Sequence, residues 1–384
     1  MPSSTLLAPG PRPAAAVRPD AVVPADALVR GPARAAWVDI AKGLSITLVV
    51  VHHVVLLLAA QHGAPAGLVE LSRTLGTVRM PVFFLASGLF AGAALAGPWS
   101  RLVHRRVALF VWLYVLWSLV RYVVFGLLAH GVDVASWSSP AVLLPQLWLP
   151  SSALWFVFAL ALFSVAAKAL RPVPGLVRLA LATGLAVVVG GGLVSVDSYA
   201  WRSMGAYFVF FLLGVDASAP IRRWAARQRR SAAVGTALGL GAAWVAVTVL
   251  VRVLDLALVP GVRWGTSLVG VGAGVALSVA LAHGRAGALP AWLGTRTLDV
   301  YLVHGPVVGV VALLLAATVP DTVGWAGAVA LLVGVTTAAI GLSLAAGRGL
   351  RATGAGWLFA LPERWAAPPR TAAAAPLAAP PIAR

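Results

Sequence analysis

The stretch GLSITLVVVHHVVLLLAAQH, residues 43–62, decides how the chain folds. It supplies the roughly 20 predominantly apolar residues that a helix needs to cross the ~30 Å hydrocarbon core of a bilayer. Its titratable residues are all histidines. We expect this stretch to be the first membrane-spanning helix. No apolar run precedes Arg34, so the start of the chain does not resemble a cleavable signal peptide.

Similar apolar segments recur along the chain. Only 10% of the 384 residues are charged and 60% are hydrophobic, whereas soluble domains carry about 25% charged residues. Besides 43–62, the segments with the composition of spans are 78–96, 107–129, 153–170, 176–194, 204–219, 232–251, 264–283, 299–318 and 324–347. The sequence therefore predicts an all-α polytopic membrane protein, a bundle of about ten transmembrane helices.

The bundle is expected to occupy residues 35–360 as one domain. Residues 1–34 and 361–384 are rich in Pro, Ala and Arg and cannot bury a core, so we predict that both are disordered tails. The formal net charge of +18 resides largely in alternate loops. By the positive-inside rule, this pattern predicts a multi-pass protein of the cell membrane with both termini in the cytosol.

The composition also limits the partners. Because orientation and attraction to membrane lipid explain the basic charge, no nucleic-acid partner is expected. The chain has no Cys, which excludes disulfides, thiolate metal sites and a cysteine acyl-enzyme. We expect no bound metal and no permanently bound cofactor.

The first predicted helix carries the residues best suited to chemistry. His53 lies about ten residues, or ~15 Å, into the helix, near the middle of the membrane. An ionisable residue at this depth is costly and is by default a functional candidate. A neutral imidazole there can accept a proton from a hydroxyl, although a hydrogen bond to a neighbouring helix is an alternative role.

Lys42 shares a helical face with His53, because ten residues at 100° each bring the two directions to within about 20°. About 16 Å separates them along the helix. This geometry suits a two-part substrate whose anionic end stays near Lys42 while its reactive end reaches His53 through a thin arm. Coenzyme A has that shape.

Several short motifs follow one another in the order of a known family. They are Asp39-Ile40-Ala41-Lys42-Gly43 followed by His53, MPVFFLASG at 80–88, Arg105-Arg106, Leu154-Trp155-Phe156, FVFFLLG at 208–214, and Leu293-Gly294 through Tyr301-Leu302-Val303-His304. Together they resemble the acyltransferase-3 family of integral membrane O-acyltransferases, which are similar to fucose 4-O-acetylases. The resemblance spans roughly residues 37–310.

The resemblance implies ten helices and an acyl-CoA-dependent O-acyltransferase. The co-substrate would be acyl-CoA, most simply acetyl-CoA, and the acceptor a hydroxyl of a carbohydrate or other glycosylated compound. His53 would be the essential base, and Lys42 would stand in the place of the family's basic residue. The chain departs from the family pattern at His52, where Gly is usual, and at Arg79, where His is frequent.

Other polar residues have a structural and a functional interpretation. Asp39 is three residues before Lys42, and a salt bridge between them is favoured over separate roles in the site. Arg105 and Arg106 could hold the phosphates of coenzyme A or simply fix the orientation in the membrane. Trp155 is a candidate substrate-binding residue through its motif.

Three more candidates lie within or beside predicted spans. Arg121 should pair with an acid or line a polar cavity that contacts substrate. His304 could contact the acyl donor or form a hydrogen bond to a neighbouring helix. Arg79 could meet a polar acceptor or extend to the membrane interface.

Two rival functions remain open. In a proton-coupled secondary transporter of a polar small molecule, the same buried His and Arg residues would form the substrate site. In a haem-binding redox protein, paired histidines within the membrane would be axial ligands.

Overall fold

The computed structural model describes residues 36–128, 140–150, 152–362 and 365, and within these ranges the chain is helical, with connecting turns and no β-strand. The described helices all belong to one compact unit, Ala35–Arg384. The disordered tails that we predicted lie outside the described residues, apart from residues 361, 362 and 365.

Six helical spans are long and apolar enough to cross a membrane. They are α1 (Ala36–Gln61), the run Trp99–Gly126 that includes most of α6 (Ala108–Leu128), α12 (Arg230–Val253), α13 (Val262–Ala282), α15 (Thr297–Thr318) and α16 (Trp325–Ala352). A seventh is possible if α10 (Tyr199–Asp216) and α11 (Ser218–Arg227), which meet at a 69° bend, count as one span. The chain is therefore a helical, multi-pass membrane protein.

Three further predicted segments form shorter helices. These are α3 (Gly76–Leu89), α8 (Trp155–Ala169) and α9 (Gly175–Gly190), of 14, 15 and 16 residues. At 1.5 Å per residue such helices extend roughly 21–24 Å, less than the ~30 Å apolar core of a bilayer. Each of the ten predicted segments thus falls on helix, while the number of membrane crossings stays a prediction.

The predicted span 78–96 is broken. Helix α3 ends at Leu89, and a separate helix α4 (Gly92–Ala96) follows after a tight turn in which the amide of Ala91 donates to the carbonyl of Gly88. Lys168 donates to the carbonyl oxygens of Leu95 and Gly97 at 2.8 and 2.6 Å. This cation satisfies carbonyl groups at the end of α4 that have no partner within the helix.

The remaining elements connect the long helices. They are α2 (Ala66–Thr74), α5 (Trp99–Leu102), the π-helical turn η2 (Val103–Val107), the short turn η3 (Pro140–Val142), α7 (Leu143–Gln146), η4 (Arg285–Gly287), α14 (Ala288–Gly294) and η5 (Ala355–Leu358).

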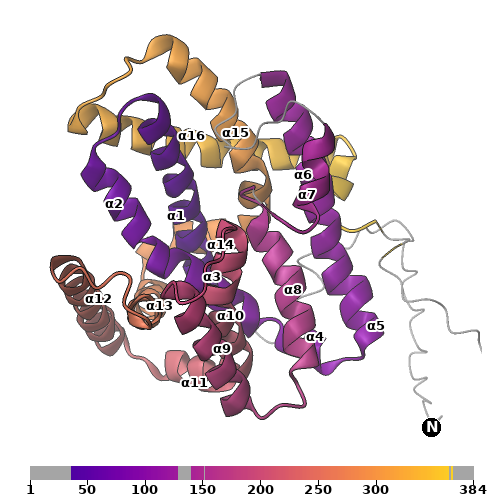
Figure 1. The fold of residues 1–384 in the computed structure, drawn as a ribbon, viewed down its shortest axis with the longest axis vertical. Helices are drawn as coiled ribbons and strands as arrows, with labels where there is room; N and C mark the ends of the chain where they lie inside the picture. Colours follow the sequence, from indigo (N-terminus) through magenta and orange to yellow (C-terminus); the bar gives the residue numbers. More distant parts are fainter. Residues whose placement is uncertain (1–35, 129–139, 151, 363–364, 366–384) are drawn as a thin grey trace, which may run out of the picture. The chain divides into compact units, whose positions relative to one another are not determined.

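Helix α1 is central, because it packs against α3, α13, α14, α15 and α16. Helices α3 and α13 pack directly against it, α10 packs against α3, and α12 packs against α13 (Figure 1). Below, the end of the bundle at which α1 begins is called the Lys42 end. The other end, where α1 finishes and α2 and the start of α3 lie, is called the Arg79 end.

Two glycines bring α1 and α14 into backbone contact. A Cβ atom at Gly294 would overlap the carbonyl group of Asp39, and one at Gly43 would overlap the carbonyl group of Pro290. Small residues of this kind let helix backbones approach closely. Two motifs that are far apart in the sequence, at residues 39–43 and 293–294, therefore meet.

Candidate functional site

The site is centred on two histidines from different helices. His53 of α1 and His304 of α15 meet edge to face, with 4.9 Å between ring centroids and 64° between ring planes. His53 is half-buried, and His304 is only 1% exposed. The structure therefore brings together two residues that the sequence pointed to separately.

Hydrogen bonds to the backbone orient both rings. Nδ1 of His53 is 2.8 Å from the carbonyl oxygen of Val49, and Nδ1 of His304 is 2.9 Å from that of Val300 and 2.8 Å from that of Tyr301. A carbonyl oxygen can only accept, so each Nδ1 carries the proton and each Nε2 keeps a lone pair. Nε2 of His304 is buried and has no hydrogen-bond partner among the described residues.

A row of polar contacts extends from this pair toward the Arg79 end. The rings of His53 and His52 are 5.6 Å apart. Nδ1 of His52 is 2.8 Å from Oγ of Ser72 in α2. Arg79 of α3 donates from Nη1 to the carbonyl oxygen of Ser72 at 2.7 Å and is only 5% exposed. Of the two roles considered for Arg79, extension to the interface does not fit this burial, and contact with an acceptor stays a prediction.

Arg121 of α6 lies beside the histidine pair. It is 3% exposed, and its guanidinium carbon is 4.9 Å from the ring centroid of Phe125. Its terminal nitrogens occupy the space that a side chain at residue 305 would fill, next to His304. The interior position expected for Arg121 is thus observed, whereas its contact with substrate stays a prediction.

Asp39 and Lys42 form the expected ion pair at the Lys42 end. The Nζ–Oδ1 distance is 3.5 Å, Asp39 is buried, and Lys42 is half-buried. Lys42 is therefore held at the start of α1, about three helical turns from His53.

Arg105 and Arg106, predicted to act together, point in different directions. Arg106 turns inward, with Nε donating to Oγ of Ser164 at 3.0 Å. Arg105 is exposed and lines a cavity of about 170 Å³ with Pro98, Ser100, Arg101 and His104. The two arginines separate because neighbouring residues on a helix point about 100° apart.

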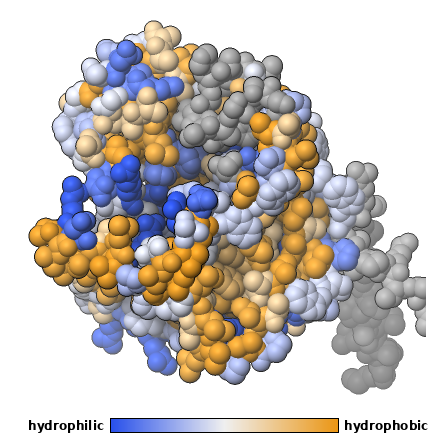
Figure 2. Space-filling view, in the orientation of Figure 1, coloured by the Kyte–Doolittle hydropathy of each residue, from blue (hydrophilic) through white to orange (hydrophobic). Residues whose placement is uncertain are grey.

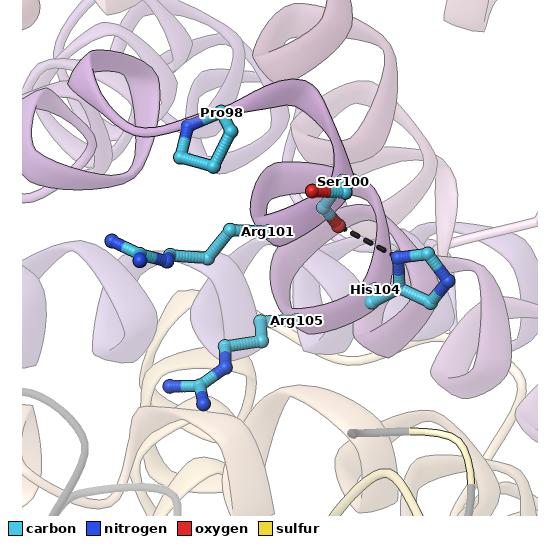
Figure 3. Close-up of a pocket in the computed structure, with 5 residues that line it drawn as sticks. All are labelled: Pro98, Ser100, Arg101, His104 and Arg105. Atoms are coloured by element: carbon cyan, nitrogen blue, oxygen red, sulfur yellow. Dashed lines mark hydrogen bonds between the residues drawn. The ribbon is translucent and has the colours of Figure 1, made fainter. Parts of the chain in front are cut away.

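Figure 3 shows how the residues of this cavity are arranged. The side chains of Arg101 and Arg105 extend in the same direction, while His104 points away and its Nδ1 is 2.7 Å from the carbonyl oxygen of Ser100. Sequence reasoning overlooked Arg101 as a partner of Arg105, although a spacing of four residues in a helix places both on one face.

Trp155, at the start of α8, belongs to a buried aromatic cluster. Its ring centroid is 5.9 Å from that of Phe84 and 6.3 Å from that of Tyr207. The cluster continues through Phe156, whose ring is 5.6 Å from that of Tyr301, and Tyr301 in turn lies 6.2 Å from His304. Trp155 therefore does not touch the histidines but is linked to His304 through Phe156 and Tyr301.

The arrangement offers little to a metal or haem. Among the described residues, no group of three or more His, Asp or Glu side chains is arranged to hold a metal ion. Two imidazoles whose centroids are 4.9 Å apart leave no space for a porphyrin between them. In this arrangement they cannot be the two axial ligands of one haem.

Comparison with known proteins identifies the family. Residues 35–344 match the family model Acyl_transf_3, described as an acyltransferase domain. No match was found among curated proteins or among solved structures. The matched region covers most of the chain and contains the histidine pair, Lys42, Arg79, Arg105, Arg106 and Arg121. The chain therefore belongs to the acyltransferase-3 family and is a membrane acyltransferase.

Proposed function

We propose that the protein transfers an acyl group, most simply acetyl, from acyl-CoA to a hydroxyl of a carbohydrate or glycosylated acceptor, with His53 as general base. One observation carries the proposal. His53 lies two thirds of the way along the central helix α1 (Ala36–Gln61) and half-buried in the bundle, with its Nδ1 bound to the carbonyl of Val49 and its Nε2 as the nitrogen that carries the lone pair.

In the proposed reaction, Nε2 of His53 accepts the proton of the acceptor hydroxyl while the hydroxyl oxygen attacks the thioester carbonyl carbon. The new C–O bond forms and the C–S bond breaks. Coenzyme A leaves as a thiolate and takes up the proton from the imidazolium, so that the base is regenerated. His304, whose buried Nε2 has no hydrogen-bond partner among the described residues, would accept a hydrogen bond within the same site.

The donor is proposed to bind from the Lys42 end, which we assign to the cytosol. Lys42 and the Arg101–Arg105 cavity provide positive charge for the phosphates of coenzyme A. The ~16 Å between Lys42 and His53 leaves room for a thin, flexible arm that carries the thioester to the imidazole. Arg106 donates to Ser164 of α8 and would therefore hold the turn that carries Arg105 against α8 rather than contact the donor.

The test is acyl transfer by purified protein in lipid nanodiscs, with ¹⁴C-acetyl-CoA as donor and a total glycolipid and glycan extract of the source membrane as acceptor. Removal of a general base typically costs 10²–10⁴-fold in rate. We therefore expect His53→Ala to lose at least about 100-fold of label transfer into polar product. His283→Ala is the matched control, because His283 is an exposed histidine just after α13.

The melting temperature of His53→Ala, followed by tryptophan fluorescence, should stay close to that of the wild type. Transfer by His53→Ala at the wild-type rate would disprove the proposed mechanism. Absence of transfer by wild-type protein, together with proton-dependent uptake of a polar solute into sealed vesicles, would favour the transporter instead.

A further inference from the structure

Arg79 is a buried cation that has no acidic partner among the described residues. The guanidinium group has five N–H donors, and in the described part of the chain its hydrogen bond runs to the carbonyl of Ser72. Glu70, the acid of the same region, is 3.9 Å from Arg73 and 3.8 Å from Arg252 instead. Within the described ranges no carboxylate forms an ion pair with Arg79, although burial of an unpaired charge is costly.

The groups around Arg79 add donors and positive charge. Arg79 interacts electrostatically with Tyr199, Tyr207 and Arg263. Nη2 of Arg263 is 3.2 Å from the hydroxyl oxygen of Tyr207. Tyr207 is buried, whereas Tyr199 and Arg263 are exposed. Two guanidinium groups and two phenolic hydroxyls therefore gather near the start of α3 and α13 and along the first half of α10. Arg79 and Tyr207 are buried, and Tyr199 and Arg263 form an exposed rim.

The region opens to the outside of the bundle. Figure 2 shows hydrophilic side chains gathered where the surface is hollowed, between the part formed by α2 and the part formed by α12 and α13. The ion pair between Glu70 of α2 and Arg252 of α12 lies across these same two parts. Tyr199 and Arg263 are exposed, so a polar solute can reach the rim of the group that surrounds Arg79.

The same region is connected to the proposed catalytic base by short contacts. Arg79 and His52 both bond Ser72, one through its carbonyl oxygen and the other through its hydroxyl. The ring of His52 lies 5.6 Å from that of His53. Ser72 and His52 therefore connect Arg79 to the histidine pair.

We propose that Arg79, with Arg263 and the hydroxyls of Tyr199 and Tyr207, binds an oxyanion of the acceptor, a carboxylate or a phosphate, and that the acceptor enters at the Arg79 end. The acceptor class is therefore an acidic or phosphorylated carbohydrate rather than a neutral one. Donor and acceptor approach His53 from opposite ends of the bundle. The role of the bound group as an acyl acceptor rests on the proposed function, whereas oxyanion binding by Arg79 is independent of it.

The experiment measures binding apart from catalysis. Full-length protein in nanodiscs is melted by tryptophan fluorescence in the presence of glucuronate, glucose 1-phosphate or neutral glucose. We expect both anionic sugars to raise the melting temperature at concentrations about 10-fold or more below that of glucose, because a charge-assisted contact contributes roughly that factor. The stronger of the two probes identifies carboxylate or phosphate as the natural group.

Arg79→Gln should raise the half-saturating concentration of the anionic sugars about 10-fold or more, and leave stabilisation by acetyl-CoA unchanged. Arg73→Gln is the matched control, because Arg73 lies on neighbouring α2 with its side chain 72% exposed. Arg263→Gln, at the exposed rim, should weaken the binding of the anionic sugars and leave the binding of glucose and acetyl-CoA unchanged. If Arg79→Gln fails to fold, Arg263→Gln is the variant that tests the proposal.

Equal stabilisation by glucose and by the anionic sugars would overturn the inference, as would no stabilisation by any of them. So would unchanged binding in Arg79→Gln, or in Arg263→Gln where that variant is the one tested. His53→Ala should keep full oxyanion binding. Failure of the proposed function would therefore appear in the label-transfer assay, and failure of the oxyanion site would appear in the melting temperatures measured with the sugars.

Discussion

Replacement of Gly294 by Ala tests the backbone contact between α14 and α1. A Cβ atom at this position would lie 2.9 Å from Cα of Asp39 and closer still to its carbonyl group. Carbon atoms in contact are normally about 3.5–4.0 Å apart. To relieve the overlap with the carbonyl oxygen of Asp39, the two backbones would have to separate by more than roughly 1 Å. Neither is the flexible end of a side chain that could move aside.

The cost should be at the upper end of the range for overpacked sites, about 3 kcal/mol. This corresponds to a fall of roughly 4 °C in the apparent melting temperature, because an unfolding entropy of about 2.1 cal/mol/K per residue gives roughly 1.2 °C per kcal/mol for a chain of this length. Because the displaced residue is Asp39, the ion pair with Lys42 would be disturbed as well. Activity with low concentrations of acetyl-CoA should fall more than stability alone explains.

The assay is tryptophan fluorescence during heating, which suits a chain with 15 Trp and no Cys. Gly334→Ala in α16 is the control, since a Cβ atom there would meet nothing within 4 Å. Ala is preferred over Gly in a helix by about 0.5–1 kcal/mol, so this control should melt slightly higher than the wild type. A Gly294→Ala protein that melts at or above the wild-type temperature would refute the reasoning.

Two further substitutions test buried polar contacts elsewhere. Asp299→Asn removes the negative charge that accepts from Nη1 of Arg351 at 2.7 Å, and we expect a loss of about 1.5–3 kcal/mol, seen as a lower melting temperature. Arg351→Lys should also lower the melting temperature, because Lys lacks the planar fork with which Arg351 binds both carboxylate oxygens. Tyr301→Phe leaves the carbonyl of Ala153 without its 2.6 Å donor; the expected cost is about 1 kcal/mol, and a melting temperature equal to the wild type would show that another donor replaces the hydroxyl.

The class of protein and the position of the helices could be predicted from the sequence, because long apolar segments have few other structures open to them in a membrane. The exact residues at which the helices begin and end were harder to predict from the sequence. Helix α1 begins at Ala36, seven residues before the apolar run, because the polar turn that holds Asp39 and Lys42 is also helical. Hydropathy detects apolar side chains and does not detect such a turn.

The contents of the site could be predicted only in part. His53 and Arg121 were singled out by the cost of burying them, and His304 by its motif. Their meeting depends on how α1, α6 and α15 pack, which short motifs do not reveal. The Arg79 cluster was missed except for Arg79 itself. Tyr199 and Arg263 are ordinary residues for a helix start near a membrane interface, and only packing brings them to Arg79.

The way in which the two imidazoles are held has a mechanical consequence. Each ring is fastened by Nδ1 to a carbonyl of its own helix, His53 to α1 and His304 to α15. Each ring therefore moves together with its own helix, so the position of one ring relative to the other depends on how α1 and α15 are placed. If α1 slid along α15 by even one residue's rise, ~1.5 Å, the edge-to-face contact between His53 and His304 would be lost. A ligand that shifts either helix would therefore change the geometry of the histidine pair.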